Sequence, residues 1–257
     1  MIIKVFYFTH NGNYRNNNED SLLIHDTVVQ TKQMKSFKYQ IINQKNPIFA
    51  VADGMGGHDK GEIASYTVLE SLNNFKHNIQ SSKDIKNEII RAKSFLNDKA
   101  NSMNSPGLGT TLCGIYFINK KALVYNVGDS RAYLLSSSKM DRITEDHSEV
   151  FELFKKNNIT EEELRVHKRK NILTSAIVGD LTDRKPLIFE KELKFSIGST
   201  FLLCTDGLWE GIPHDMFNQF LEKDSSEESF CNQLISFSLK YSGLDNISFI
   251  LIKVVDI

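Results

Sequence analysis

The sequence predicts an α+β fold in which antiparallel sheets carry helices on their outer faces. Runs of β-branched and aromatic residues follow one another like hairpins, which is typical of antiparallel strands. Segments with helical periodicity occur in pairs, each pair after several strands, which argues against a β-α-β alternation. The chain has 257 residues, 40% of them hydrophobic, and shows no repeat or linker. We therefore expect a single domain over 1–257.

Turn residues bound each predicted strand, and the period of the apolar residues separates strands from helices. The strands are expected at 2–9, 21–30, 39–43, 47–52, 109–118, 121–127, 131–135, 187–192, 199–204 and 246–255. The helices are expected at 61–78, 83–103, 213–222 and 227–241. Ile85, Ile89 and Ala92 lie on one helical face, and Pro213 suits the start of a helix. Residues 145–172 are polar, and we expect short helices there in an excursion between strands.

Composition and charge argue against several classes of protein. The 31 Lys and Arg residues nearly balance the 32 Asp and Glu residues, so the chain lacks the basic excess of a nucleic-acid binder. Cys113, Cys204 and Cys231 are too scattered for a disulfide framework or a cysteine zinc site, which indicates a reducing compartment. Cys204 interrupts an apolar run and is expected in the core.

The first residues, MIIKVFYFTH, form a short apolar run without a cleavage site for a signal peptide. No stretch of the sequence approaches the roughly 18 apolar residues that a membrane span requires. We therefore expect a cytoplasmic protein without membrane contact, and a monomer.

Acidic residues stand at the ends of several predicted strands. Asp53 closes the apolar run of AVADGMGG, and Asp206 closes that of TFLLCTDG. Glu19 and Asp20 enter the strand of NNNEDSLLI, and Asp245 enters the last strand in GLDNISFILI. An Asp-Gly turn would explain any one of them alone. Together they match what a site on a rigid sheet scaffold requires.

Clustered carboxylates repel one another, so they need a cation or must take up protons. Oxygen ligands favour Mg²⁺ or Mn²⁺ over zinc, and Gly54 would let a backbone carbonyl approach the ion. Two such ions, typically about 3.5 to 4 Å apart, lower the pKa of a bridging water, and phosphoester hydrolysis is the natural use. Arg15 precedes Asp20 and would bind phosphate, although spacing alone favours a surface arginine.

Taken in order, these motifs resemble the metal-dependent protein phosphatase 2C family, in its bacterial form. The matching stretches are GNYRNNNEDS at 12–21, FAVADGMGG at 49–57, GLGTTL at 107–112, NVGDSRAYL at 126–134, TEDHS at 144–148, LLCTDG at 202–207 and LDNISFILI at 244–252. The resemblance implies a four-layer αββα sandwich, in which two antiparallel sheets lie between pairs of helices. It also implies hydrolysis of phosphoserine and phosphothreonine in proteins by a metal-activated water.

The resemblance further assigns roles to the acidic residues. Asp53 would bridge two Mg²⁺ or Mn²⁺ ions, Gly54 would offer its carbonyl, and Asp20, Asp206 and Asp245 would complete the coordination, in part through water. Asp129 of NVGDSR resembles the residue that holds a third ion together with the Asp206 position. Glu19 would orient metal-bound waters, and Arg15 would bind the phosphoryl group.

One departure concerns the general acid, because Met55 stands where many eukaryotic members have a histidine. His58 lies nearby in the sequence, but a lone loop histidine is more often a surface residue, so the general acid is left unassigned. Residues 145–172 correspond to the flap of the family. Its basic HKRK stretch at 167–170 would favour acidic or phosphorylated partners, although a solvated surface stretch is the simpler interpretation.

Two alternatives to a protein phosphatase stay open at this point. A catalytically silent phosphatase-like module would bind a phosphoprotein or regulate a kinase, but it would not need to keep the metal ligands. A hydrolase of small phosphates would need an enclosed pocket. A cysteine-dependent phosphatase is excluded, because no cysteine has an arginine six residues later. The expected partners are phosphoproteins, including a serine/threonine kinase or its substrates.

Overall fold

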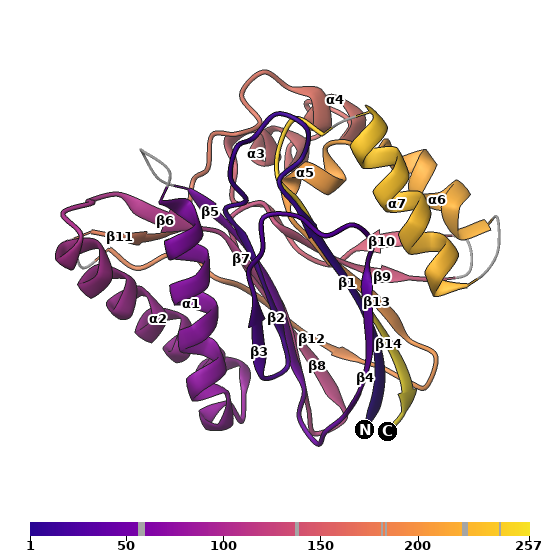
Figure 1. The fold of residues 1–257 in the computed structure, drawn as a ribbon, viewed down its shortest axis with the longest axis horizontal. Helices are drawn as coiled ribbons and strands as arrows, with labels where there is room; N and C mark the ends of the chain where they lie inside the picture. Colours follow the sequence, from indigo (N-terminus) through magenta and orange to yellow (C-terminus); the bar gives the residue numbers. More distant parts are fainter. Residues whose placement is uncertain (56–59, 137–138, 181, 183, 223–225, 242) are drawn as a thin grey trace.

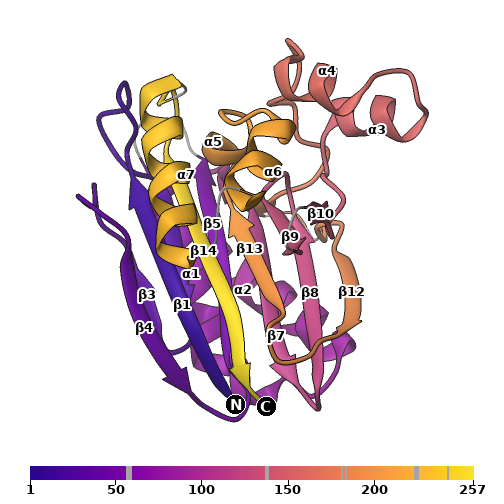
Figure 2. The same cartoon turned by 90° about the vertical axis from the view of Figure 1, so that its right-hand side faces the viewer.

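A computed structural model describes residues 1–55, 60–136, 139–180, 182, 184–222, 226–241 and 243–257. Two antiparallel sheets face each other, and helices cover both outer faces, as the expected four-layer sandwich requires (Figures 1 and 2). The two termini lie together at one end of the sheets (Figure 1), where Ile2 pairs with Asp256.

The first sheet has six strands within the described part of the chain, in the order β10-β9-β13-β14-β1-β4. Its members are β1 (Ile2–His10), β4 (Lys38–Asn43), β9 (Arg131–Leu135), β10 (Met140–Arg142), β13 (Thr200–Cys204) and β14 (Ile247–Asp256). The pairing of β1 with β14 joins the two ends of the sequence along nine residues of β1. That register brings His10 opposite Ile247, so the loops that adjoin these two residues meet at the same end of the sheet.

The second sheet has eight strands among the described residues. Its main path is β11-β6-β5-β7-β8-β12, and β2 pairs with β5 and with β3. Its members are β2 (Asp20–Ile24), β3 (Thr27–Val29), β5 (Ile48–Met55), β6 (Leu108–Thr110), β7 (Leu112–Ile118), β8 (Lys121–Val127), β11 (Ile177–Gly179) and β12 (Phe189–Lys194).

Helices form the two outer layers. They are α1 (Gly61–Phe75), η1 (Lys76–Asn78), α2 (Ser82–Ser102), α3 (Glu149–Lys155), α4 (Glu161–Val166), α5 (Asp206–Trp209), α6 (His214–Glu222) and α7 (Glu227–Tyr241). In Figure 1, α1 and α2 cover the second sheet, whereas α6 and α7 cover the first. The flap, residues 145–172, contains α3 and α4 at the end of the sheets opposite the termini (Figure 2). A capping box formed by Thr160 and Glu163 begins α4.

Apolar side chains fill the three spaces between the four layers. Val5, Phe49 and Ile250 are among the residues that pack between the two sheets. Separate clusters pack each sheet against its helices. Cys204 is fully buried in one of these clusters, as expected, and all three cysteines are free thiols. In the described part of the chain, no helix combines the length and the apolar character needed to cross a bilayer.

The structure corrects two of the predicted strands. The run at 21–30 is a hairpin of β2 and β3, because the chain turns at His25 with a φ of 57°. The run at 109–118 is divided between β6 and β7 at Thr111, whose backbone N–H donates to the carbonyl of Asp53. The short elements β10, β11 and α5 were not predicted, since three or four residues are too few to show a period.

Candidate active site

Asp20 and Asp53 lie directly opposite each other on two neighbouring strands. Asp20 begins β2, Asp53 lies near the end of β5, and the register of the two antiparallel strands pairs them. Residues paired in this way have Cα atoms about 4.5 to 5.5 Å apart. The second sheet therefore holds two carboxylates together at the end remote from the chain termini (Figure 1).

Three further aspartates come to the same place from other segments. Asp206 begins α5 just after β13, Asp245 precedes β14, and Asp129 lies in the loop between β8 and β9. Burial raises the pKa of Asp53 well above its usual range, and the negative charges of the other four aspartates raise it further. We call these five residues the carboxylate cluster: Asp20, Asp53, Asp129, Asp206 and Asp245.

Asp20 shows how strongly this environment opposes ionisation. Its side chain is fully buried, and this burial raises its pKa to about 8, with a further contribution from the charge of Asp206. The hydroxyl of Thr205 donates a hydrogen bond of 2.9 Å to Asp20 Oδ2. Within the described part of the chain, Oδ1 of Asp20 and Oδ1 of Asp206 are buried without a hydrogen-bond partner. Buried oxygens of this kind are suited to bind a cation.

Gly54 allows two segments of backbone to approach closely. A Cβ atom at this position would lie 2.0 Å from the carbonyl oxygen of Gly61, at the start of α1. The N–H of Gly54 donates to the carbonyl of Glu19 over 3.1 Å. A side chain at Gly54 would therefore separate β5 from α1 and from the residue that precedes Asp20.

Glu19 joins the cluster to the first helix. Its Oε1 accepts a hydrogen bond from the N–H of Gly61 at 3.0 Å, so the carboxylate holds the start of α1. Its own N–H donates to Asn246 Oδ1 over 2.8 Å. The structure thus places Glu19 beside the cluster and gives it a connection to both sheets.

Arg15 contacts Asp245 of the cluster and is therefore not an isolated surface arginine. Its Nη2 is 2.8 Å from Asp245 Oδ2, and 55% of its side chain remains exposed. The loop that carries it is fixed to the other end of the chain, because Asn13 N–H donates to the Gly243 carbonyl over 2.6 Å. Arg15 is therefore tethered by its backbone while its guanidinium faces solvent beside a carboxylate.

Asn246 and Thr205 are structural partners that the sequence analysis missed. Besides accepting from Glu19, Asn246 donates through Nδ2 to the carbonyls of Asn11 and Asn17 at 3.2 and 2.9 Å. Thr205 binds Asp20 as described above. Each of these residues directly adjoins a predicted ligand, Asp245 or Asp206, and this adjacency is the signal that could have identified them.

Asp129 connects the cluster to the flap. Its carbonyl accepts a hydrogen bond from Trp209 Nε1 at 3.0 Å, and the Arg131 guanidinium lies 3.4 Å from the centre of the Trp209 ring. Arg131 in turn forms a buried ion pair of 2.6 Å with Asp146 of the flap. Burial raises the pKa of Asp129 well above its usual range, with a further contribution from Asp206.

The donor set fits divalent cations that retain much of their water. Among the described residues, no three His, Cys, Asp or Glu side chains by themselves form a group that could hold a metal ion. Mg²⁺ is usually bound by one or two carboxylates and keeps several waters. The carboxylate cluster, with two orphan buried oxygens and only oxygen donors, matches that requirement.

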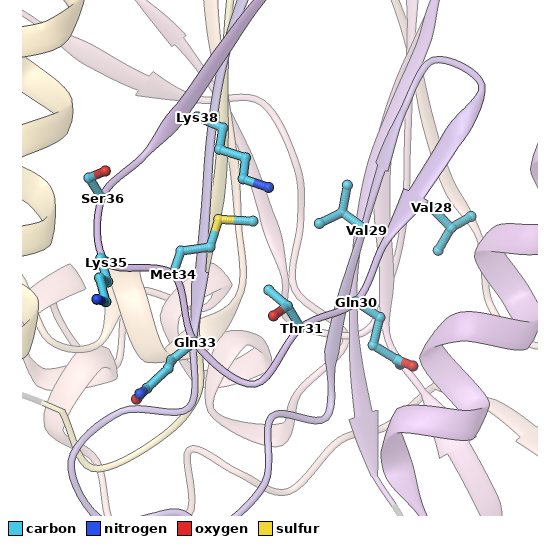
Figure 3. A pocket seen from close by; sticks show the side chains of 9 residues that line it. All are labelled: Val28, Val29, Gln30, Thr31, Gln33, Met34, Lys35, Ser36 and Lys38. Carbon is cyan, nitrogen blue, oxygen red and sulfur yellow. The ribbon is translucent and has the colours of Figure 1, made fainter.

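A hollow of about 570 Å³ between β3 and β4 is a different feature (Figure 3). It is lined by Val28, Val29, Gln30, Thr31, Gln33, Met34, Lys35, Ser36 and Lys38. None of these nine residues is acidic, and the Lys38 side chain reaches toward the space beside Val29 (Figure 3). This hollow therefore offers no carboxylate to a hard cation and is not the metal centre.

Residues 6–247 match the model described as Protein phosphatase 2C. The chain belongs to the protein phosphatase 2C family. The serine/threonine phosphatase stp of Listeria innocua is 32% identical over 217 residues, which are 81% of this chain and 85% of that protein. Protein phosphatase PhpP of Streptococcus pneumoniae is 28% identical over 245 residues, which are 91% of this chain and 97% of that protein.

Solved phosphatase 2C structures support the same assignment. Serine/threonine phosphatase Stp1 from Staphylococcus aureus has a TM-score of 0.80 at 29% identity and covers 98% of this chain and 95% of its own. The catalytic domain of PstP, solved in complex with two manganese ions, has a TM-score of 0.77 at 25% identity and covers all of both chains. The expected family, fold class and enzyme class are therefore confirmed, and none of these relatives favours a catalytically silent module.

Proposed function

We propose that this phosphatase 2C enzyme hydrolyses phosphoserine and phosphothreonine in proteins with Mg²⁺ or Mn²⁺ at the carboxylate cluster. The observation that carries the proposal is the meeting of five aspartates from both sheets beside an exposed arginine. When bound, the divalent cations act as Lewis acids and lower the pKa of the water that attacks phosphorus.

Each residue of the cluster receives a role under this proposal. Asp53 would be shared by two ions, the Gly54 carbonyl would be a further ligand, and Asp20, Asp206 and Asp245 would complete the set. Asp129 would help to hold a third ion together with Asp206. The rigid register of β2 and β5 fixes the first two carboxylates before a metal or a substrate arrives, so binding requires little reorganisation at this position.

Arg15 binds the phosphoryl group of the substrate. A guanidinium can donate to two phosphate oxygens at once, and the exposed side chain of Arg15 is accessible from solvent. Its neighbour Asp245 holds the guanidinium beside the cluster. Glu19, held between Gly61 and Asn246, orients the ordered water around the ions.

Met55, which follows the Asp-Gly pair, has no proton to donate to the leaving alkoxide. His58, the other residue considered for this role, lies outside the described residues. The general acid therefore stays unassigned, as in the sequence analysis.

The wider setting is proposed on the same basis. The chain acts as a single catalytic domain over 1–257 and as a monomer, with residues 145–172 as a flap beside the site. Its substrates include a serine/threonine kinase or the proteins that such a kinase phosphorylates. The proposed location is cytoplasmic and without membrane contact, and the free thiols at all three cysteines support the reducing compartment.

The test is hydrolysis of p-nitrophenyl phosphate and a phosphothreonine peptide by purified protein with EDTA, Mg²⁺ or Mn²⁺. We expect turnover that requires the metal and is lost in Asp53→Asn. The matched control is Asp26→Asn, an exposed aspartate in the turn beyond the other end of β2. A folded protein without turnover in any metal would favour the silent module instead.

A further inference from the structure

A second hollow, of about 550 Å³, is lined in part by Met55, which follows Asp53 of the carboxylate cluster by two residues on β5. We call it the basic hollow, and its lining comes from several parts of the chain. They include Met55 at the end of β5, residues 173–176 and Val178 after the flap, and Asp180 with residues 184–187 between β11 and β12. Lys93 of α2 also lines it.

Met55 connects the basic hollow to the proposed site of phosphate hydrolysis. Asp53 and Met55 are two residues apart on β5, so their side chains leave the same face of the strand, about 7 Å apart. An extended peptide advances about 3.3 Å per residue. A substrate whose phosphorylated residue lies at the cluster can therefore place residues two or three positions away in the hollow.

Charge distinguishes this hollow from its surroundings. Lys93 is neutralised, because its Nζ lies 2.9 Å from Asp180 Oδ1. Arg184 and Lys185 are exposed, and neither has an ion-pair partner among the described residues, which exclude Asp183. Two cations of the lining are therefore exposed, whereas the charges of Lys93 and Asp180 offset each other.

The loop that carries these cations is held in place. Leu187 N–H donates to Ser175 Oγ over 2.8 Å, which ties the loop to the segment after the flap. The N–H of Asp180 donates to Asn97 Oδ1 of α2 at 3.1 Å. Asp180 and Leu187, which stand on either side of the two cations in the sequence, are thus each tied to the fold, and a binding surface needs such support.

The basic stretch of the flap is less available to a substrate. Arg169 pairs with Glu149, and Lys170 pairs with Glu210. Two of its cations are therefore already engaged within the protein. Arg184 and Lys185 are therefore better suited to bind an acidic partner than the HKRK stretch at 167–170.

We infer that the basic hollow binds the substrate residues that flank the phosphorylated residue, and that Arg184 and Lys185 select acidic side chains there. The inference rests on the proposed function. The substrate class is then a phosphoprotein segment with Asp or Glu two or three residues from the phosphoserine or phosphothreonine. Met55 and Leu187, which is 62% exposed, offer apolar contact to the same segment.

The test compares phosphothreonine peptides that differ only in having Glu, Gln or Lys at two and three positions from the phosphothreonine, on either side. The variants are Arg184→Ala/Lys185→Ala and Arg184→Glu/Lys185→Glu. The control is Lys191→Ala/Lys194→Ala, which removes two exposed charges from β12 outside the hollow. Turnover of p-nitrophenyl phosphate with Mn²⁺ reports the metal centre alone.

We expect the wild type to prefer the Glu peptide, and the alanine variant to lose about three- to tenfold in kcat/KM on that peptide alone, as for two exposed charge pairs. The glutamate variant should prefer the Lys peptide, and added NaCl should reduce both preferences. Equal use of Glu and Gln peptides by the wild type would overturn the inference, as would an equal loss in the control. Without turnover of p-nitrophenyl phosphate, the proposed function itself fails, and the inference fails with it.

Discussion

Replacing Asp53 with asparagine should have opposite effects on stability and on activity. Asp53 faces Asp20 across the strand pair, and two ionised carboxylates about 5 Å apart repel by about 3 kcal/mol at an effective dielectric constant of 20. Burial already keeps protons on part of the cluster, because it raises the pKa of both residues. We therefore expect Asp53→Asn to stabilise the metal-free protein by roughly 1 to 3 kcal/mol.

The same substitution should remove most of the response to metal. A cation that binds only the folded state stabilises it by about 2.7 kcal/mol at a concentration 100 times its dissociation constant. Asp53→Asn removes the ligand proposed to bridge both ions, so this increment should be lost. Loss of a residue that only hydrogen-bonds a metal ligand lowers activity by up to about 100-fold. Asp53 is proposed to be a ligand itself, so turnover should fall by at least about 100-fold.

Thermal unfolding with EDTA and with Mn²⁺ measures both effects. For a chain of this size, 1 kcal/mol corresponds to about 2 to 4 °C in Tm. The variant should unfold about 2 to 12 °C higher than the wild type in EDTA, yet show little further rise with Mn²⁺. Asp26→Asn should match the wild type in both conditions. A variant that gains as much from Mn²⁺ as the wild type, or keeps near-normal turnover, would refute the assignment of Asp53.

Three further predictions follow from single contacts. Arg15→Ala should chiefly raise KM for phosphopeptides, because a guanidinium binds the phosphoryl group, and Arg15→Lys should recover part of the loss. Steady-state kinetics in which only kcat changed would refute this role. Gly54→Ala should lower Tm and turnover together, since its Cβ would lie 2.0 Å from the Gly61 carbonyl oxygen, and an unchanged melting curve would contradict this clash. Burial raises the pKa of Asp20 to about 8, so below that pH a proton occupies the group and must leave before metal binds. The dissociation constant for Mn²⁺, measured by calorimetry, should therefore fall as pH rises from about 6 to about 8, and a constant value would contradict competition with protons.

The location of the aspartates could be predicted from the sequence because strand ends fix it. An apolar run that stops at Asp53 or Asp206 places that carboxylate at the edge of a sheet, whatever the order of the strands. Their common position at one end of the sandwich follows from the antiparallel pairing of β2 with β5 and of β13 with β14. The layers themselves were predictable because periods of two and of 3.6 residues persist over whole elements.

The partners of these residues could not be predicted, because they depend on contacts between distant parts of the chain. Arg15 and Asp245 are 230 positions apart and meet only because β1 and β14 pair with His10 opposite Ile247. Composition and periodicity do not determine that register. The hydrogen bonds of Asn246 to the loop at 11–17 depend on it in the same way.

The carboxylate cluster also links metal binding to the stability of the fold. The described part of the cluster keeps two buried carboxylate oxygens, Oδ1 of Asp20 and of Asp206, without a hydrogen-bond partner and places Asp20 opposite Asp53, although both features oppose folding. A structure selected only for stability would replace one of these groups, because a neutral side chain removes the repulsion. Their presence is understandable if a cation supplies the missing charge and contacts. The metal-free enzyme should therefore be less stable as well as inactive, since the residues that prepare the site for metal destabilise the fold without it.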